Sequence, residues 1–128
     1  MDWKGTLGEA TTNRQSLVII GPSGCGKTTI ARHIAPKPSL FCTHVDILRQ
    51  FRPGYHKSII FDDVNFTHIP REGQINIVEF EQPRAIHVRY GVVTIPAGVV
   101  KVFTANVLPI STNDPAIARR VKLYYIEQ

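Results

Sequence analysis

The fold is decided by Gly21-Pro22-Ser23-Gly24-Cys25-Gly26-Lys27-Thr28, which fits the pattern G-x-x-x-x-G-K-[ST] at every defined position. Directly before it, Leu17-Val18-Ile19-Ile20 is a short apolar run typical of a strand buried on both faces. Directly after it, residues 27–34 carry apolar side chains at helical spacing, and Pro36 prevents the helix from continuing. A glycine-rich loop between a buried strand and a helix predicts an α/β fold with a parallel sheet.

The same loop predicts a binding site for the phosphates of a nucleoside triphosphate, with ATP as the expected nucleotide. Glycines let the backbone turn its N–H groups inward, and the following helix adds the positive end of its dipole. Lys27 would bridge the β- and γ-phosphates, and the Thr28 hydroxyl would bind a Mg²⁺ ion. The alternative is a glycine turn without a ligand. The predicted nucleotide-binding residues are Gly21, Pro22, Ser23, Gly24, Cys25, Gly26, Lys27, Thr28 and Thr29.

A second motif is Ile59-Ile60-Phe61-Asp62-Asp63, an apolar strand that ends in two carboxylates. We expect Asp62 to hold the Mg²⁺ ion through water. Asp63 points the other way and is predicted to act as the general base on the attacking water. An Asp pair can also begin a turn. The phosphate loop upstream favours the catalytic interpretation.

Two further groups complete the predicted catalytic set. Val102-Phe103-Thr104-Ala105-Asn106 is an apolar strand that ends in an amide, and Asn106 would orient the lytic water and contact the γ-phosphate. Arg119 and Arg120, beside a short predicted helix, would offer a charge to the nucleotide of a neighbouring subunit, as an arginine finger does. The alternatives are an Asn that forms a turn and arginines that are solvated at the surface. The predicted catalytic residues are Lys27, Asp63, Asn106, Arg119 and Arg120.

The two cysteines, Cys25 and Cys42, have neither metal-ligand spacing nor the number needed for a disulfide framework, and both fit a reducing compartment. Cys25 lies in the phosphate loop at a helix N-terminus, where the thiolate is favoured over the thiol. We therefore expect a thiol reagent to inactivate the protein and bound nucleotide to slow that reaction. The alternative is that Cys25 points away from the phosphates as a small packing residue.

The rest of the chain predicts strands that alternate with short helices, without repeats or linkers. We expect strands at 40–42, 58–61, 99–104 and 121–126, helices at 46–51, 71–80 and 116–119, and a hairpin over 85–96 with its turn near Gly91. The predicted fold is a mainly parallel five-stranded sheet flanked by helices, with a β-hairpin insertion. Residues 16–128 would form this core, and residues 1–15 would lead into it.

Composition restricts the class of protein. The chain has 128 residues, of which 43% are hydrophobic and 20% charged, which indicates one globular domain and excludes disorder. No apolar run is long enough to span a bilayer, so we expect a soluble, intracellular protein without a membrane partner. The formal net charge is +5, and no acidic residue occurs between Glu81 and Asp114. This distribution suits a polyanionic partner or a solvated surface.

Together, the phosphate loop, Asp62-Asp63, Phe103-Thr104-Ala105-Asn106 and Ala118-Arg119-Arg120-Val121 resemble the helicase domain of superfamily 3. The likeness is greatest to the replication initiator (Rep) proteins of small circular single-stranded DNA viruses and related plasmids. It covers residues 16–128 and keeps the family's order of motifs. It implies an AAA+-like sheet, a DNA helicase that couples ATP hydrolysis to translocation or unwinding, and a homo-oligomer that forms a hexameric ring in the full-length protein.

The resemblance also implies a nucleic-acid contact. The segment from Val88 to Pro96 lies where the family has a hairpin that grips single-stranded DNA, with RNA as a further possibility. Arg89, Tyr90 and Lys101 are the predicted contacts, through cations for phosphates and an aromatic face for a base. A Tyr and an Arg on a hairpin are also common packing residues. The family implies the host nucleus for a protein of a eukaryotic virus and the cytoplasm for a plasmid protein.

The chain departs from the family in two features. No two histidines are two positions apart, so we do not expect the His-hydrophobic-His motif of the DNA-nicking domain. The helical oligomerisation segment that precedes the family's ATPase core would be reduced to residues 1–15. Two other functions remain open, which are a nucleotide-dependent assembly module on nucleic acid with slow turnover and a small P-loop kinase. The kinase lacks support because the sequence has no arginine-rich lid between helices.

Overall fold

Five parallel strands form the central sheet of the computed structural model, which describes residues 1–127. Their order across the sheet is β2-β3-β6-β1-β7, and β4 and β5 form a separate antiparallel hairpin. The elements are α1 (Trp3–Thr12), β1 (Ser16–Ile20), α2 (Lys27–Ile34), β2 (Ser39–Cys42), the 3₁₀ helix η1 (Val45–Gln50), β3 (Ser58–Asp62), α3 (Arg71–Val78), β4 (Arg84–Val88), β5 (Gly91–Ile95), β6 (Val100–Ala105), α4 (Pro115–Ala118) and β7 (Val121–Tyr125). Gln128, the last residue of the predicted core, lies outside the described residues.

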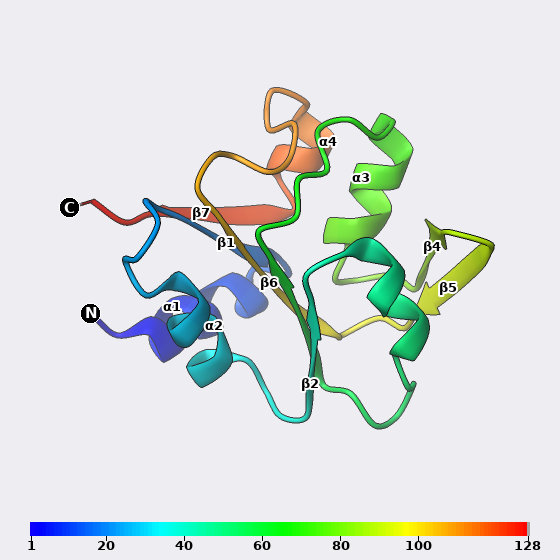
Figure 1. Ribbon diagram of the computed structural model, residues 1–128, viewed down its shortest axis with the longest axis horizontal. Coiled ribbons are helices and arrows are strands. Elements are labelled where there is room, and N and C mark those ends of the chain that lie inside the picture. The colour runs from blue at the N-terminus through cyan, green and yellow to red at the C-terminus, as the bar shows by residue number, and fades with distance from the viewer. Residues whose placement is uncertain (128) are drawn as a thin grey trace.

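Both faces of the sheet are covered, which gives three layers (Figure 1). Successive strand side chains point to opposite faces. Leu17 and Ile19 therefore pack with α1 and α2 on one face, whereas Val18 and Ile20 belong to the core under η1, α3, α4 and the hairpin. All four side chains are at most 4% exposed, which explains why the strand is a continuous apolar run.

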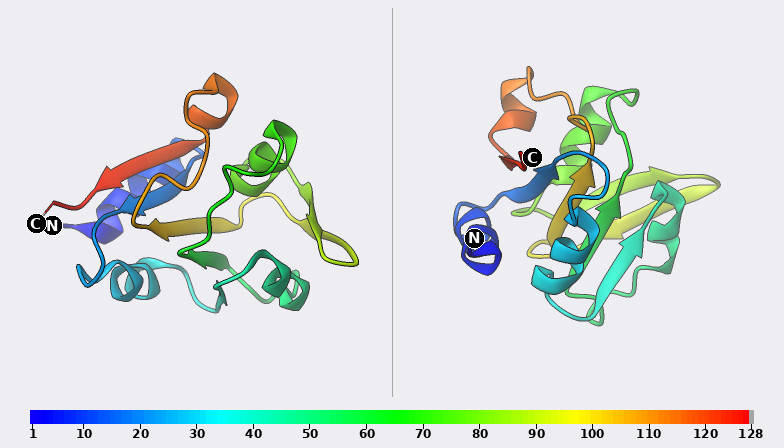
Figure 2. Two further views of the ribbon diagram at one scale, coloured as in Figure 1. Left: turned by 45° about the horizontal axis from the view of Figure 1, so that its top comes forward. Right: turned by 60° about the vertical axis from the view of Figure 1, so that its left-hand side comes forward.

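The sequence predictions for the fold class are confirmed: the sheet is parallel, has five strands and is flanked by helices, and the antiparallel hairpin is present. The hairpin loop is Arg89-Tyr90, one position before the predicted turn at Gly91, and Tyr90 has a φ of 64°. The hairpin stands on the α3 side of the sheet, as Figure 2 shows. Among residues 1–127, no helix has the length and apolar character needed to cross a membrane.

Local sequence patterns did not predict helix α1, because Gly5, Gly8 and several threonines give residues 3–12 a low intrinsic helix propensity; only the resemblance implied a reduced helical segment here. Tertiary contacts compensate for this. The Asp2 carboxylate caps the helix by accepting a hydrogen bond from the Gly5 N–H at 2.9 Å. Leu7 and Ala10 are buried against the sheet beside β1. The first residues of the chain are therefore part of the same core as the sheet.

Candidate active site

The loops that follow β1, β3 and β6 meet at one edge of the sheet, because parallel strands present their carboxyl ends at the same edge. Strand β6 lies between β1 and β3. Asn106, which follows β6, therefore emerges between the glycine-rich loop after β1 and the Asp62-Asp63 pair at the end of β3. Ligands of open α/β sheets bind at this edge.

Lys27 connects the glycine-rich loop to Asn106. Its Nζ donates hydrogen bonds to the carbonyl oxygens of Gly21 and Pro22, at 2.9 and 3.0 Å, and to Oδ1 of Asn106 at 3.0 Å. The Asn106 amide in turn donates to the Ser23 hydroxyl at 3.0 Å. All of these acceptors are neutral, and Lys27 forms no ion pair within residues 1–127. The positive charge of Lys27 is thus left without a counter-charge.

Thr28 and Asp62 form the second contact of the site. The Thr28 hydroxyl donates to Oδ1 of Asp62 at 2.6 Å, and the Thr104 hydroxyl donates to the same oxygen at 2.9 Å. No role was predicted for Thr104 from the sequence. Its position on the strand, two residues before Asn106, indicates that it lies near the site. Its contact with Asp62, however, depends on the register of β3 and β6, in which the two residues are paired.

The backbone of the loop requires glycine at two positions. Gly24 and Gly26 have φ angles of 79° and 88°, in the left-handed region that favours glycine. Gly26 is the N-cap residue of α2, so the loop leads directly into the helix N-terminus. The Cys25 thiol points toward the start of the loop. Its Sγ lies 3.9 Å from Lys27 Nζ, and it would lie only 3.0 Å from a Cβ atom if Gly21 were replaced by another residue.

Asp63 also has a left-handed backbone, with a φ of 57°, which Asp tolerates better than most residues. Its N–H donates to the carbonyl oxygen of Thr104 at 2.8 Å, which holds the turn after β3 against β6. The side chain is exposed. Asp63, Asn65 and Asn106 border a common hollow of about 80 Å³. The residues predicted to act as general base and as water-orienting amide therefore border the same small space.

The structure separates the two predicted finger arginines. The Arg120 side chain is 12% exposed, and its guanidinium donates to the Glu79 carboxylate at 3.2 Å and to the Ala116 carbonyl oxygen at 2.6 Å. The Arg119 side chain is exposed. Both residues lie just before β7, at the amino edge of the sheet and opposite Lys27. The prediction for Arg120 is corrected, because its charge is used within its own chain.

The prediction that Lys101 contacts nucleic acid is wrong. Lys101 lies on the central strand β6, is 2% exposed and donates its Nζ hydrogen bond to the carbonyl oxygen of Glu79. Burial lowers the pKa of Lys101 from 10.5 to about 8, an effect that Glu79 opposes and Arg84 reinforces. A group in the core cannot reach a nucleic acid. By contrast, Arg89 and Tyr90 are exposed at the end of the hairpin, with the Arg89 guanidinium 4.9 Å from the centroid of the Tyr90 ring.

Glu79 is the centre of the buried charges at the amino edge, and no local sequence pattern predicts this role. Its carboxylate accepts from Arg84 at 2.9 Å, from Arg120 at 3.2 Å and from the N–H groups of Phe80 and Glu81 at 3.0 and 2.9 Å. Burial alone would raise the pKa of Glu79, but these hydrogen bonds and the nearby charge of Arg120 lower it to about 2. Glu79 is therefore ionised and fully paired at neutral pH.

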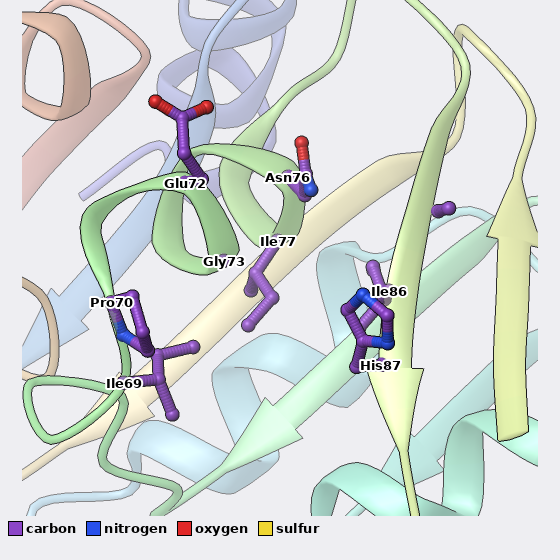
Figure 3. A pocket seen from close by; sticks show the side chains of 9 residues that line it. Ile69, Pro70, Glu72, Gly73, Asn76, Ile77, Ile86 and His87 are labelled. Carbon is purple, nitrogen blue, oxygen red and sulfur yellow. The ribbon is translucent and has the colours of Figure 1, made fainter.

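An apolar groove of about 340 Å³ lies elsewhere, between α3 and β4 (Figure 3). None of the predicted site residues lines it. Its lining residues are Ile69, Pro70, Glu72, Gly73, Asn76, Ile77, Ala85, Ile86 and His87. Lys27, Thr28, Asp62 and Asn106 lie at the carboxyl edge of the sheet instead. No protein-family model matches this chain, and no curated protein matches it.

Proposed function

We propose that this chain binds ATP with Mg²⁺ at the carboxyl edge of its sheet and hydrolyses it. The observation that carries the proposal is the pair of contacts that link the glycine-rich loop to two other strands. Lys27 is hydrogen-bonded to Asn106, and Thr28 to Asp62. These four side chains come from three separate motifs, and each has the chemistry expected of a triphosphate site.

The residues present fit a magnesium ion. The Thr28 hydroxyl and the Asp62 carboxylate lie 2.6 Å apart and are oxygen donors, which Mg²⁺ prefers; its remaining ligands are usually water and phosphate oxygens. Across residues 1–127, no group of three or more His, Cys, Asp or Glu side chains could hold a metal ion. When bound, the ion would neutralise charge on the phosphate oxygens. Lys27 would exchange its carbonyl acceptors for the β- and γ-phosphates.

Hydrolysis requires a positioned water molecule. The hollow bordered by Asp63 and Asn106, at about 80 Å³, has room for one and offers polar partners. The Asp63 carboxylate accepts a proton from this water as its oxygen attacks the γ-phosphorus, and the bond to the β-phosphate oxygen breaks. The Asn106 amide donates a hydrogen bond to the water or to a γ-phosphate oxygen. The products are ADP and inorganic phosphate.

The strand order supports an AAA+-like P-loop ATPase over a small kinase. Because β6 is inserted between β1 and β3, Asn106 stands beside Lys27, where it can respond to the γ-phosphate. A kinase would instead need an opening for an acceptor molecule and a basic lid. The basic insertion of this chain, the hairpin over residues 84–95, packs beside α3, away from the phosphate loop.

We extend the proposal to a helicase motor of the superfamily 3 type that acts on single-stranded DNA. The exposed Arg89 and Tyr90 support a contact with a phosphate and a base. The exposed Arg119 lies at the edge of the sheet opposite Lys27, so it suits the nucleotide of a neighbouring subunit in a ring better than its own. A nucleotide-dependent assembly module would share this site, but single-stranded DNA would not accelerate its turnover.

The test is Mg²⁺-dependent ATPase activity with and without single-stranded DNA, for the wild type and for Lys27→Ala. We expect activity in the wild type and a loss of at least about 100-fold in Lys27→Ala, because the charge that neutralises the transferred phosphoryl group is removed. Lys57→Ala is the matched control, since Lys57 is exposed before β3 and lies outside the site. Equal activity in Lys27→Ala and Lys57→Ala would refute the proposal, and acceleration by DNA would separate a motor from an assembly module.

A further inference from the structure

The loop of the hairpin is held by a residue from a distant part of the sequence. The Arg89 N–H donates a hydrogen bond to Oδ1 of Asp46 at 2.7 Å, and the two residues are 43 positions apart. Asp46 lies in the first turn of η1, which packs against β4 and is drawn in blue-green in Figure 1. The loop of Arg89 and Tyr90 is therefore attached to the rest of the protein at its tip, and not only through β4 and β5.

Asp46 is itself fixed in place. Its N–H donates to Nδ1 of His44, the N-cap residue of η1, at 3.1 Å. Its neighbours Val45 and Ile47 are half-buried and pack against the core that contains Ile86 of β4. The Asp46 side chain is 26% exposed. Its carboxylate is thus a fixed acceptor on a packed element.

The loop needs such support, because its backbone conformation is strained. Val88 pairs with Gly91, which leaves Arg89 and Tyr90 as a two-residue loop. Tyr90 has a φ of 64°, in the left-handed region that a bulky residue rarely adopts. Conformations of this kind persist where surrounding contacts hold them. The hydrogen bond from the Arg89 N–H to Asp46 is such a contact, one residue before the strained position.

The charge of Asp46 makes its position informative. It is the only acidic residue between Glu9 and Asp62. A carboxylate beside a loop that binds phosphate opposes binding through charge repulsion. The hydrogen bond offsets this effect, because an ionised acceptor bonds to an N–H more strongly than a neutral one. The carboxylate therefore suits a contact with the loop and not a contact with the ligand.

We propose that Asp46 is a positioning residue for nucleic-acid binding, which fixes the hairpin loop so that Arg89 and Tyr90 are presented together. The proposal rests on the proposed function and specifies one determinant of its nucleic-acid contact. The Arg89 guanidinium lies 4.9 Å from the centroid of the Tyr90 ring, so the two can meet a phosphate and a neighbouring base. Without the hydrogen bond, the loop is less ordered, and ordering it on binding costs conformational entropy.

The test compares Asp46→Ala with Asp46→Asn, which have the same charge but differ in the acceptor. The Asn side chain keeps an Oδ1 for the Arg89 N–H, whereas Ala removes it. Fluorescence anisotropy of a labelled oligothymidylate measures the affinity for single-stranded DNA. We expect Asp46→Ala to bind roughly fivefold more weakly than Asp46→Asn, and Asp46→Asn to bind at least as tightly as the wild type. Glu9→Ala, on α1 across the sheet, is the control for net charge and should bind like the wild type.

Two further readouts separate positioning from a general loss of stability. Hydrogen exchange of the Arg89 amide should become faster in Asp46→Ala but not in Asp46→Asn, while the amides of the central sheet keep their protection. The DNA concentration for half-maximal ATPase stimulation should rise about fivefold in Asp46→Ala, with the rate at saturating DNA unchanged. Equal DNA affinity of the two Asp46 variants, or faster exchange throughout the sheet, would overturn the proposal.

Arg89→Ala distinguishes this outcome from a failure of the hairpin contact itself. If Arg89→Ala binds DNA weakly and the two Asp46 variants bind it equally, the hairpin contact stands and only the role of Asp46 fails. If Arg89→Ala binds DNA as the wild type does, or if the wild type does not bind it, the hairpin contact fails and the role of Asp46 fails with it. ATP hydrolysis without DNA is measured separately and tests the site at the carboxyl edge.

Discussion

The two edges of the same sheet use charged side chains in opposite ways, as Lys27 and Lys101 illustrate. At the carboxyl edge, the Lys27 amine donates to two carbonyl oxygens and to the Asn106 amide, and it forms no ion pair within residues 1–127. At the amino edge, Lys101 is 2% exposed and belongs to a cluster in which Glu79 also pairs with Arg84 and Arg120. Lys27 is therefore available to bind an anion, whereas Lys101 stabilises the fold.

Whether a charged side chain is available to a ligand depends less on its location than on whether the chain already provides an opposite charge. Burying an ionised group is unfavourable unless hydrogen bonds and opposite charges replace water. The amino edge meets this requirement through Glu79, so its charges are structural. The carboxyl edge leaves Lys27 without a carboxylate partner, so a ligand is expected to supply the negative charge.

Replacing Glu79 should have the largest effect on stability. Glu79→Ala leaves Arg120 and Lys101 buried without a counter-charge, and removing one partner of a buried pair typically costs about 3–5 kcal/mol. Lys27→Ala should change the free energy of unfolding by no more than about 0.5 kcal/mol. Urea denaturation of both variants measures the difference. If Glu79→Ala costs no more than Lys27→Ala, the amino-edge charges are not structural.

Asp63→Asn should separate hydrolysis from nucleotide binding at the carboxyl edge. The amide occupies the same space but cannot accept the proton of the attacking water, so we expect hydrolysis to slow by about 100-fold or more. Nucleotide affinity and thermal stability should stay close to those of the wild type, because the Asp63 side chain is exposed. Single-turnover hydrolysis and calorimetry make the two measurements. Wild-type turnover in this variant would assign the general base to another group.

Cys25 at the carboxyl edge should react with a thiol reagent faster than the buried Cys42. Cys42 is fully buried on β2, and burial raises the pKa of its thiol to about 12, so it should resist an alkylating reagent. Cys25 lies in the loop, 3.9 Å from Lys27 Nζ, and should be modified first, with loss of ATPase activity that bound nucleotide slows. Cys25→Ser should remain active and become insensitive to the reagent. Equal sensitivity of Cys25→Ser would show that Cys25 is not the target.

The smallest effect should appear in the pH dependence of stability. The pKa of Lys101 is about 8 in the folded chain against an ordinary value of 10.5, so the folded state releases this proton first and stability rises from about pH 8 toward 10.5. Between pH 8 and 9, the wild type should gain about 1 kcal/mol relative to Lys101→Met. Denaturation at both pH values measures the gain, and Lys57→Met is the control. An identical pH dependence in Lys101→Met and the wild type would contradict the burial of this charge.

Local patterns along the chain were sufficient to predict the parallel sheet, the hairpin and the residues at the carboxyl edge. A buried strand, a glycine-rich loop and a helix are recognisable from neighbouring residues, since periodicity and turn chemistry act over a few positions. Asp62 and Asn106 could be anticipated for the same reason, because each directly ends an apolar run. Local sequence is therefore sufficient to identify the side chains that emerge at the ends of the strands.

Tertiary packing, by contrast, sets which of these side chains contact one another and which are buried. Thr104 contacts Asp62 because β3 and β6 pair in one register, and Lys101 is buried because that same β6 is a central strand. Arg120 differs from Arg119 because Glu79 lies within reach of only one of the two guanidinium groups. Trp3, near the start of the chain, packs edge-on against Tyr124, near its end. Burial and side-chain pairing depend on strand order and register. Residues that are distant in the sequence determine both, so local sequence patterns do not predict them.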